Sequence, residues 1–163
     1  MNKLRLAVSS DFERILELEH KCFGENEMVS KNGLKWRMDN FPEHTIVIEE
    51  DNKVVAYISY IFSNEFCVDD CYFSDDVTDS ETGKFCIIIG VATDPEYQKK
   101  GYSSKLIKQL LESINKPVIL TCHEYLIDFY KHFGFKLINM ASSTFNGATW
   151  YNMTYKTDIM PFR

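Results

Sequence analysis

The sequence predicts an α/β fold in which helices cover one mixed sheet. The clearest strand is Phe85–Thr93, a continuous apolar run without alternation, which is typical of a central strand buried on both faces. Residues 45–49 and 53–62 are two strand-like runs around a polar turn, which predicts an antiparallel hairpin. Residues 101–114 follow Phe85–Thr93 and carry their apolar side chains on one face of a helix. With the segments described next, the order is βααββ, βα, βα, ββ, which gives six to seven strands and about four helices.

The N-terminal segments predict one strand and two helices. Residues 4–8 form a short strand pattern, and Ser10-Asp11-Phe12-Glu13 offers a capping box for the helix that follows. We expect this helix to end at Gly24, and residues 31–40 to form a second, shorter helix. The apolar residues that keep helical spacing in the first helix are Phe12, Ile15, Leu16, Cys22 and Phe23.

The second half of the chain predicts a strand, a helix and a final pair of strands. Residues 117–121 are a buried strand pattern, and residues 125–133 predict a helix that Gly134 closes in a left-handed conformation. Residues 135–140 and 149–155 predict the last two strands. Residues 64–84 are irregular and acidic, which predicts a loop or a short helix outside the core. The acidic side chains of this segment are Glu65, Asp69, Asp70, Asp75, Asp76, Asp79 and Glu81.

Composition and charge exclude several classes of protein. The length of 163 residues fits one domain, residues 1–163. The net charge of −6, from 18 Lys and Arg against 24 Asp and Glu, argues against nucleic acid as a partner. No apolar run approaches the roughly 20 residues of a membrane helix, and the N-terminus has no signal-peptide pattern, so we expect a cytoplasmic protein with no membrane partner. Five scattered cysteines fit a reducing compartment.

The most informative stretch is the turn at residues 98–104. It leads from Phe85–Thr93 into a helix, so its backbone N–H groups have no partner within the helix and can bind a pyrophosphate, with the helix dipole behind them. Gly101 lets the backbone approach closely, and Lys99 and Lys100 add positive charge. A solvated loop is the alternative interpretation.

Two motifs in this sequence resemble those of the GNAT superfamily of acetyltransferases. Gln98-Lys99-Lys100-Gly101-Tyr102-Ser103 is similar to the family's pyrophosphate-binding motif, Gln/Arg-x-x-Gly-x-Gly/Ala, with Ser103 as the small final residue. Phe129-Tyr130-Lys131-His132-Phe133-Gly134-Phe135 resembles the family's Tyr-x-x-x-Gly-Phe motif at the expected distance. The order of strands and helices agrees with this family over nearly the full chain. The resemblance therefore implies the GNAT fold, with its fourth and fifth strands splayed apart.

The resemblance also implies an acetyl-CoA-dependent N-acetyltransferase. The pantetheine arm would lie between the splayed strands and pair with the main chain, and a free amine would attack the thioester directly in a ternary complex. Tyr130 would be the general acid that protonates the leaving thiolate, unless it is only part of an aromatic face. The residues implied to bind acetyl-CoA are Val91, Ala92, Thr93, Gln98, Lys99, Lys100, Gly101, Tyr102, Ser103 and Ser104.

The general base is not evident in the sequence. Many relatives use a Glu or His on the fourth strand, but residues 85–90 offer neither. His123 and the acidic segment 64–84 are the remaining candidates, and His123 could instead be a helix cap or a surface residue. Cys67 and Cys71 lack a second pair of ligands at a plausible spacing, so we expect no metal.

The acceptor is predicted from charge and from a looser resemblance. The segment 64–84 would attract a cation such as a polyamine or an arylalkylamine, unless it is merely a solvated loop. Residues 120–124, leading into Phe129 and Tyr130, resemble arylalkylamine N-acetyltransferase-like proteins, although Ile87 and Ile89 stand where those enzymes carry histidines. The alternatives are acetylation of a protein N-terminus or lysine, and a sensor that binds acetyl-CoA without turnover. The oligomeric state, a homodimer included, stays open.

Overall fold

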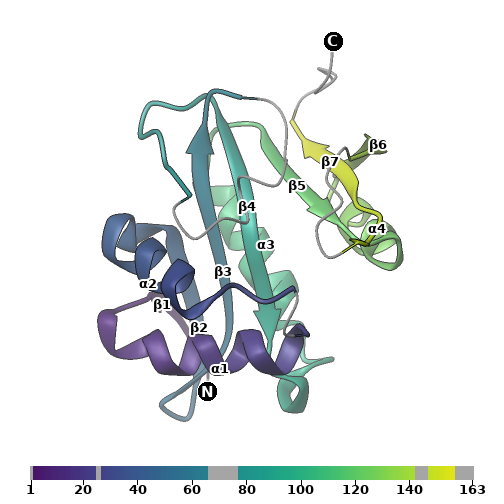
Figure 1. The fold of residues 1–163 in the computed structure, drawn as a ribbon. Helices are drawn as coiled ribbons and strands as arrows, with labels where there is room; N and C mark the ends of the chain where they lie inside the picture. Colours follow the sequence, from purple (N-terminus) through teal and green to yellow (C-terminus); the bar gives the residue numbers. More distant parts are fainter. Residues whose placement is uncertain (1, 25–26, 66–76, 142–146, 157–163) are drawn as a thin grey trace.

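The computed structural model describes residues 2–24, 27–65, 77–141 and 147–156. Their strands form one seven-stranded sheet in the order β1-β2-β3-β4-β5-β7-β6, antiparallel throughout except for the parallel pair β4 and β5 (Figure 1). The strands are β1 (Asn2–Leu6), β2 (Thr45–Glu50), β3 (Lys53–Ser63), β4 (Phe85–Thr93), β5 (Val118–Cys122), β6 (Lys136–Met140) and β7 (Tyr151–Tyr155). The predicted mixed α/β sheet is confirmed.

Four α-helices occur in the described residues, two on each face of the sheet. They are α1 (Phe12–Cys22), α2 (Lys31–Asn40), α3 (Tyr102–Ser113) and α4 (Ile127–Lys131). The first two pack on Val47, Val54 and Tyr57, whose side chains leave one face of the sheet. The other two pack on the opposite face, around Ile58 and Leu120. Because both faces are covered, β4 is buried along most of its length, as its apolar run predicts.

The fourth and fifth strands splay apart, which confirms the expectation from the resemblance. Their parallel pairing consists of Cys86 with Val118 and Ile87 with Ile119, and β5 then diverges from β4 (Figure 1). On its other edge β4 pairs with β3 along its full length, with one irregularity that leaves Ile89 as an extra residue. Such a bulge bends a strand and increases its twist, which helps to turn β4 away from β5.

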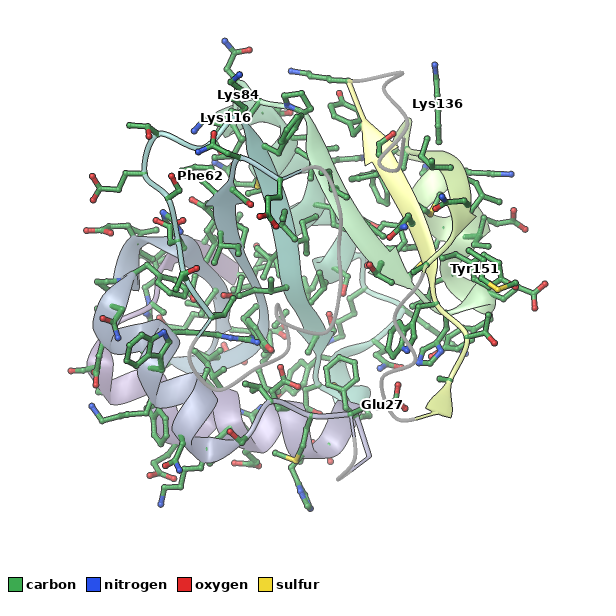
Figure 2. All side chains as sticks on the ribbon, turned by 45° about the horizontal axis from the view of Figure 1, so that its top comes forward. Glu27, Phe62, Lys84, Lys116, Lys136 and Tyr151 are labelled. Atoms are coloured by element: carbon green, nitrogen blue, oxygen red, sulfur yellow. The ribbon has the colours of Figure 1, made fainter. Side chains whose placement is uncertain are left out.

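The two ends of the β4–β5 pair differ, because the strands are paired at one end and separate at the other. At the end where the strands are still paired, Lys116 donates to the Gly83 carbonyl at 2.6 Å and its Nζ lies 3.8 Å from the centre of the Phe62 ring. Figure 2 shows Phe62 and Lys116 at this end and Glu27 at the opposite end. The open end of the splay therefore lies beside Glu27, in the loop between α1 and α2.

The N-terminal boundaries differ from the prediction. The strand β1 lies two residues earlier than expected, and a 3-10 turn, Ser9–Asp11, precedes α1. The 3-10 turn is capped by Asp11, whose carboxylate accepts from the Val8 N–H at 2.8 Å. Arg5 donates to the same carboxylate at 2.7 Å, and this ion pair holds Asp11 in place. The predicted capping box that begins at Ser10 is thus wrong. Gly24 does not end the helix in a left-handed conformation either, since the chain already turns to extended backbone at Phe23.

Several later boundaries are closer to expectation. The helix predicted at 125–133 is shorter, with a 3-10 turn, Glu124–Leu126, before α4, and Gly134 has the predicted left-handed φ of 101°. Most of the acidic segment 64–84 lies outside the described residues. Of its remainder, Asp79 accepts from the Phe62 N–H at 2.6 Å, and Val77 is buried, so this end packs on the sheet. No helix of the described residues is long and apolar enough to cross a membrane.

Candidate functional site

A pocket lies beside the turn that leads from β4 into α3, and we call it the turn pocket. Its volume is about 480 Å³. It is lined by Cys22, Phe23, Val91, Ala92, Thr93, Gln98, Lys99, Gly101, Tyr102, Ser103, Ser104, Tyr125, Leu126, Phe129 and Tyr130. It therefore brings together the end of β4, the first turn of α3 and the Tyr130 segment.

The backbone of the turn has the shape of an anion cradle. Lys99 and Gly101 have left-handed φ values of 66° and 82°, and α3 begins directly afterwards at Tyr102. Left-handed residues within a turn aim successive N–H groups into one concavity, and the positive end of α3 adds to it. A Cβ at Gly101 would have no neighbouring atom within 4 Å, so lack of space does not require glycine here. Glycine is favoured instead because the backbone is left-handed.

Hydrogen bonds fix this turn to the end of β4. The hydroxyls of Thr93 and Ser103 lie 2.6 Å apart, and the Gln98 amide donates to the Thr93 carbonyl at 3.3 Å. One predicted residue directs its side chain elsewhere, since the Lys100 Nζ lies 3.7 Å from a Glu50 carboxylate oxygen and Lys100 does not line the pocket. Tyr102 lines the pocket, and its side chain is buried.

Asp94 anchors the start of the turn to the first helix. Its side chain is fully buried and accepts from Arg14 at 2.6 Å and from the Glu96 N–H at 3.0 Å, with Lys21 at 3.4 Å. Burial alone would raise the pKa of Asp94, but the bonds from Glu96, Arg14 and Lys21 lower it below its ordinary value. The charged carboxylate thus connects α1 to the turn pocket at neutral pH.

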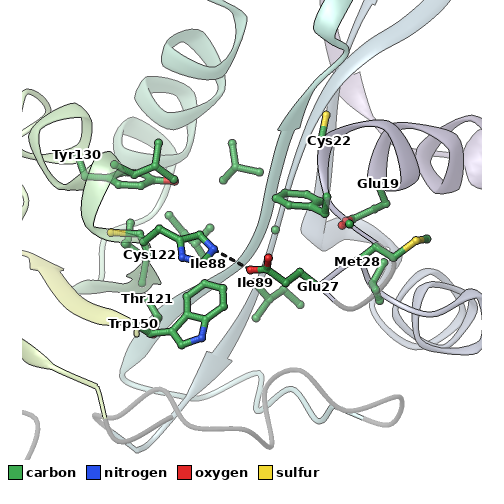
Figure 3. A pocket seen from close by; sticks show the side chains of 18 of the residues that line it. Glu19, Cys22, Glu27, Met28, Ile88, Ile89, Thr121, Cys122, Tyr130 and Trp150 are labelled. Carbon is green, nitrogen blue, oxygen red and sulfur yellow. Dashed lines mark hydrogen bonds and ion pairs between the residues drawn. The ribbon is translucent and has the colours of Figure 1, made fainter. Parts of the chain in front are cut away.

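A second pocket lies in the opening between β4 and β5, and we call it the splay pocket. Its volume is about 210 Å³. Its polar lining includes Glu19 of α1, Glu27, Thr121, His123 and Tyr130. In Figure 3, Tyr130 and Glu19 enter from opposite sides and Glu27 lies between them. Six residues line both pockets: Cys22, Phe23, Val91, Tyr125, Leu126 and Tyr130.

Tyr130 lies where the two pockets meet. It is 7% exposed, and its ring contacts Phe129 and Phe135 edge to face, so it is part of the aromatic face as well as of both pocket walls. Burial raises the pKa of Tyr130 above its ordinary value. Its phenol therefore carries its proton at neutral pH, which is the state that a general acid requires.

His123 lies at the edge of the splay pocket, just past β5. Its Nε2 is 2.7 Å from a carboxylate oxygen of Glu27, which is 96 residues away in the sequence. Its ring stacks on Trp150 and Tyr125, with centroid distances of 4.3 Å and 5.6 Å. The structure thus places His123 in the wall of the splay pocket, where it contacts Glu27.

Glu19 is one of the polar residues of this pocket that sequence reasoning missed, together with Glu27, Arg37 and Thr121. It is 3% exposed and accepts a hydrogen bond from the hydroxyl of the fully buried Tyr57. Burial raises the pKa of Glu19, against the opposing effects of the Tyr57 bond, the Arg37 charge and the Val29 N–H. A signal was available, because Glu19 lies four residues after Ile15 on the apolar face of α1.

The cysteines of the pockets are unsuited to nucleophilic catalysis. Burial raises the pKa of Cys22 to about 11 and that of Cys122 to about 12, so both are thiols at neutral pH. Cys22 also donates to the Thr93 carbonyl at 3.1 Å. Within the described ranges, no group of three His, Cys, Asp or Glu is placed to bind a metal ion.

A family model described as the acetyltransferase (GNAT) family matches residues 12–135, which include both pockets' strands and both motifs. The chain belongs to this acetyltransferase family. The predicted superfamily is therefore confirmed, and with it the general class of a transferase. The sequence matches no curated protein.

Solved structures of this family share the fold. The loading GNATL domain of CurA from Lyngbya majuscula has a TM-score of 0.82 at 18% identity, with 95% of this chain and 97% of that chain covered. The GphF GNAT-like decarboxylase in complex with isobutyryl-CoA has a TM-score of 0.78 at 14% identity, covering 94% and 98%. Arabidopsis thaliana Naa50 in complex with the bisubstrate analogue CoA-Ac-MVNAL has a TM-score of 0.72 at 16% identity, covering 96% and 99%. Two of these GNAT proteins thus carry a coenzyme A derivative.

Proposed function

We propose that this GNAT protein is an acetyl-CoA-dependent N-acetyltransferase that acts on the primary amine of a small cationic molecule. The observation that carries the proposal is the meeting of two pockets at Val91 and Tyr130. One pocket has the backbone of an anion cradle, and the other holds carboxylates. A thioester in the first and an amine in the second would bring their reacting atoms together beside the Tyr130 phenol.

The residues of the turn pocket suit coenzyme A. The N–H groups of residues 98–104 would bind the pyrophosphate, with Lys99 adding charge. The main chain of residues 91–93 would pair with the pantetheine arm as an added strand, because β5 has already diverged from β4 there. One N–H of this segment would stabilise the negative charge on the thioester oxygen during attack. Lys100, whose side chain is directed to Glu50, would contribute through its backbone.

Tyr130 would act at the end of the transfer. When the amine attacks the thioester carbon, the carbon–nitrogen bond forms and the carbon–sulfur bond breaks. The departing sulfur needs a proton, and Tyr130 is the protonated group on the wall that both pockets share. His123, whose Nε2 contacts the Glu27 carboxylate, is the candidate base that we predicted from the sequence.

The dimensions and charges of the splay pocket favour a small amine. Its volume of about 210 Å³ is below the roughly 300–1,000 Å³ of sites for drug-sized ligands. Glu27 and His123, whose contact is 2.7 Å, also line this pocket, so a bulky peptide would compete with that pair for space. An arylalkylamine or a polyamine is the substrate that we propose. The peptide part of the analogue bound to Naa50 makes a protein N-terminus the runner-up.

Release of free thiol from acetyl-CoA tests the proposal. We expect the purified protein to release thiol with at least one amine from a panel of arylalkylamines, polyamines and aminoglycosides, faster than with peptides. A panel of peptides with free N-termini measures the runner-up. Acetyl-CoA binding by calorimetry with no thiol release would instead indicate the sensor. Loss of carbon dioxide from a carboxylated acyl-CoA would indicate the kind of reaction named for GphF.

A further inference from the structure

The structure offers two candidates for the base that the β4 strand lacks. The β4 wall of the splay pocket consists of residues 88–91, which carry no titratable side chain. His123 lines the pocket, its Nε2 faces Glu27 and its ring is stacked on Trp150. Glu19 lies on the opposite wall from Tyr130 (Figure 3). The two candidates differ in exposure, because the His123 side chain is 27% exposed and Glu19 is 3% exposed.

Glu19 is held with its carboxylate toward the pocket. Tyr57 donates a hydrogen bond to it from β3, and the Val29 N–H donates from the loop before α2. The charged or titratable groups that face it are Arg37 on α2, Cys22 on α1 and Tyr57 itself. These contacts come from three elements, so the carboxylate is fixed before any substrate arrives.

The contact between Tyr57 and Glu19 reaches the β4 backbone. A Cβ at Gly90 would lie 3.0 Å from the Tyr57 hydroxyl oxygen, a tight contact that glycine avoids. Gly90 directly precedes Val91, where the wall shared by both pockets begins. Glu19 thus lies across the splay pocket from Tyr130, beside the segment of β4 where the thioester would lie.

We propose that Glu19 is the general base that accepts the proton of the amine substrate, an inference that rests on the proposed function. The ammonium gives one proton to Glu19, which passes it to solvent through the pocket. The neutral nitrogen then attacks the thioester carbon, and the bond to sulfur breaks. Tyr130 gives its proton to the sulfur. The nitrogen loses its second proton as the amide forms, and this proton restores the Tyr130 phenol. The products are the amide, the free thiol and one released proton.

Burial prepares Glu19 for this role. A carboxylate with an ordinary pKa is a weak base at neutral pH, and the desolvation that raises the pKa of Glu19 makes it a stronger one. The Tyr57 bond, which favours the charged form, opposes this rise. His123 is then a residue that holds Glu27 in the wall of the pocket.

The experiment measures kcat/KM for two acceptors whose amines differ in pKa. For an alkylamine of pKa near 10, we expect Glu19→Gln to reduce kcat/KM about 10²- to 10³-fold, as for loss of a general base. For an amine of pKa near 7, already mostly neutral at the assay pH, the loss should be less than about tenfold. Acetyl-CoA affinity should be unchanged, which also shows that the variant is folded. Glu13→Gln, on the exposed side of the same helix, is the control.

The outcomes separate the inference from the proposed function. An equal loss for both acceptors means that Glu19 is structural, and no loss means that it is not used; either overturns the inference while the wild type still acetylates amines. A loss that depends on amine pKa in His123→Gln but not in Glu19→Gln assigns the base to His123 and also overturns it. If the wild type releases no thiol with any amine, the proposed function fails, and the inference fails with it.

Discussion

The turn pocket and the splay pocket share a wall but are built from different parts of the chain. Most of the turn pocket comes from residues 91–93 and 98–104, which are neighbours in the sequence and are joined by local hydrogen bonds. The polar groups of the splay pocket come from α1, the loop after it, α2, β5, the segment after β5 and α4. A coenzyme common to a whole family can be bound by the main chain, whereas a particular acceptor has to be recognised by side chains. Substitutions in the turn pocket should therefore change coenzyme binding, and substitutions in the splay pocket should change the kinetics of the amine.

Tyr130 belongs to both pockets, so its substitution gives the largest expected effect. Tyr130→Phe keeps the ring packing and removes the acidic proton, and kcat should fall about 10²- to 10⁴-fold. Acetyl-CoA affinity should change little, since the backbone of the turn is untouched. Tyr151→Phe, in β7 and outside both pockets, is the matched loss of a phenol. Steady-state kinetics with calorimetric binding measures both quantities, and full activity would leave Tyr130 as a core aromatic only.

Gly101 tests whether the turn pocket alone binds the coenzyme. Gly101→Val should weaken acetyl-CoA binding by about 1–3 kcal/mol, because a β-branched residue cannot keep the left-handed turn and its N–H groups lose the pyrophosphate. Amine KM should remain nearly constant at saturating coenzyme. Gly147→Val carries a similar left-handed strain, at φ 66°, away from both pockets. Equal coenzyme affinity in folded Gly101→Val and in the control would contradict the placement.

Tyr57 tests how the splay pocket sets the pKa of Glu19. The Tyr57 hydrogen bond lowers the pKa of Glu19, so Tyr57→Phe should raise that pKa further. A base must be deprotonated, and the acid limb of the kcat/KM profile should therefore move to higher pH, with activity lost below the limb and retained above it. Tyr60→Phe, on the same strand and the other face, should leave the limb in place. If the acid limb does not move in Tyr57→Phe, the group that titrates there is not Glu19.

The acidic segment gives the smallest expected effect. If Asp69, Asp70, Asp75 and Asp76 steer a cationic amine, their joint replacement by Asn should raise the amine KM and leave coenzyme binding alone. The change should shrink with added salt, since exposed charges are screened over about 8–10 Å at physiological ionic strength. Measuring KM at low and high salt decides this, and an unchanged KM at both would favour a solvated loop. These four residues lie outside the described part of the chain.

The sequence predicted the sheet, the turn and the position of Tyr130 because the decisive residues are contiguous there. Left-handed positions, a helix start and a buried strand follow one another within residues 85–104, so local rules suffice. The splay pocket depends on contacts between distant segments, such as Glu27 with His123 across 96 positions and Glu19 with Tyr57 across 38. Spacing rules do not give such pairs. Glu19 could still have been found, because a carboxylate within the apolar face of an amphipathic helix requires a partner.

The divergence of β5 leaves a free edge of β4 inside the sheet. Beyond the pairing of Ile87 with Ile119, this edge has no ladder partner among the described strands. Unpaired strand edges on a protein surface invite other chains to add to them, and they are a common origin of aggregation. Here the edge faces a cleft walled by aromatic side chains, among them Phe23, Tyr125 and Tyr130. The proposed pantetheine arm is thin and unbranched, whereas a polypeptide strand carries side chains that would have to share this space with the aromatic rings. The edge would thus be more open to the proposed ligand than to a second copy of the protein.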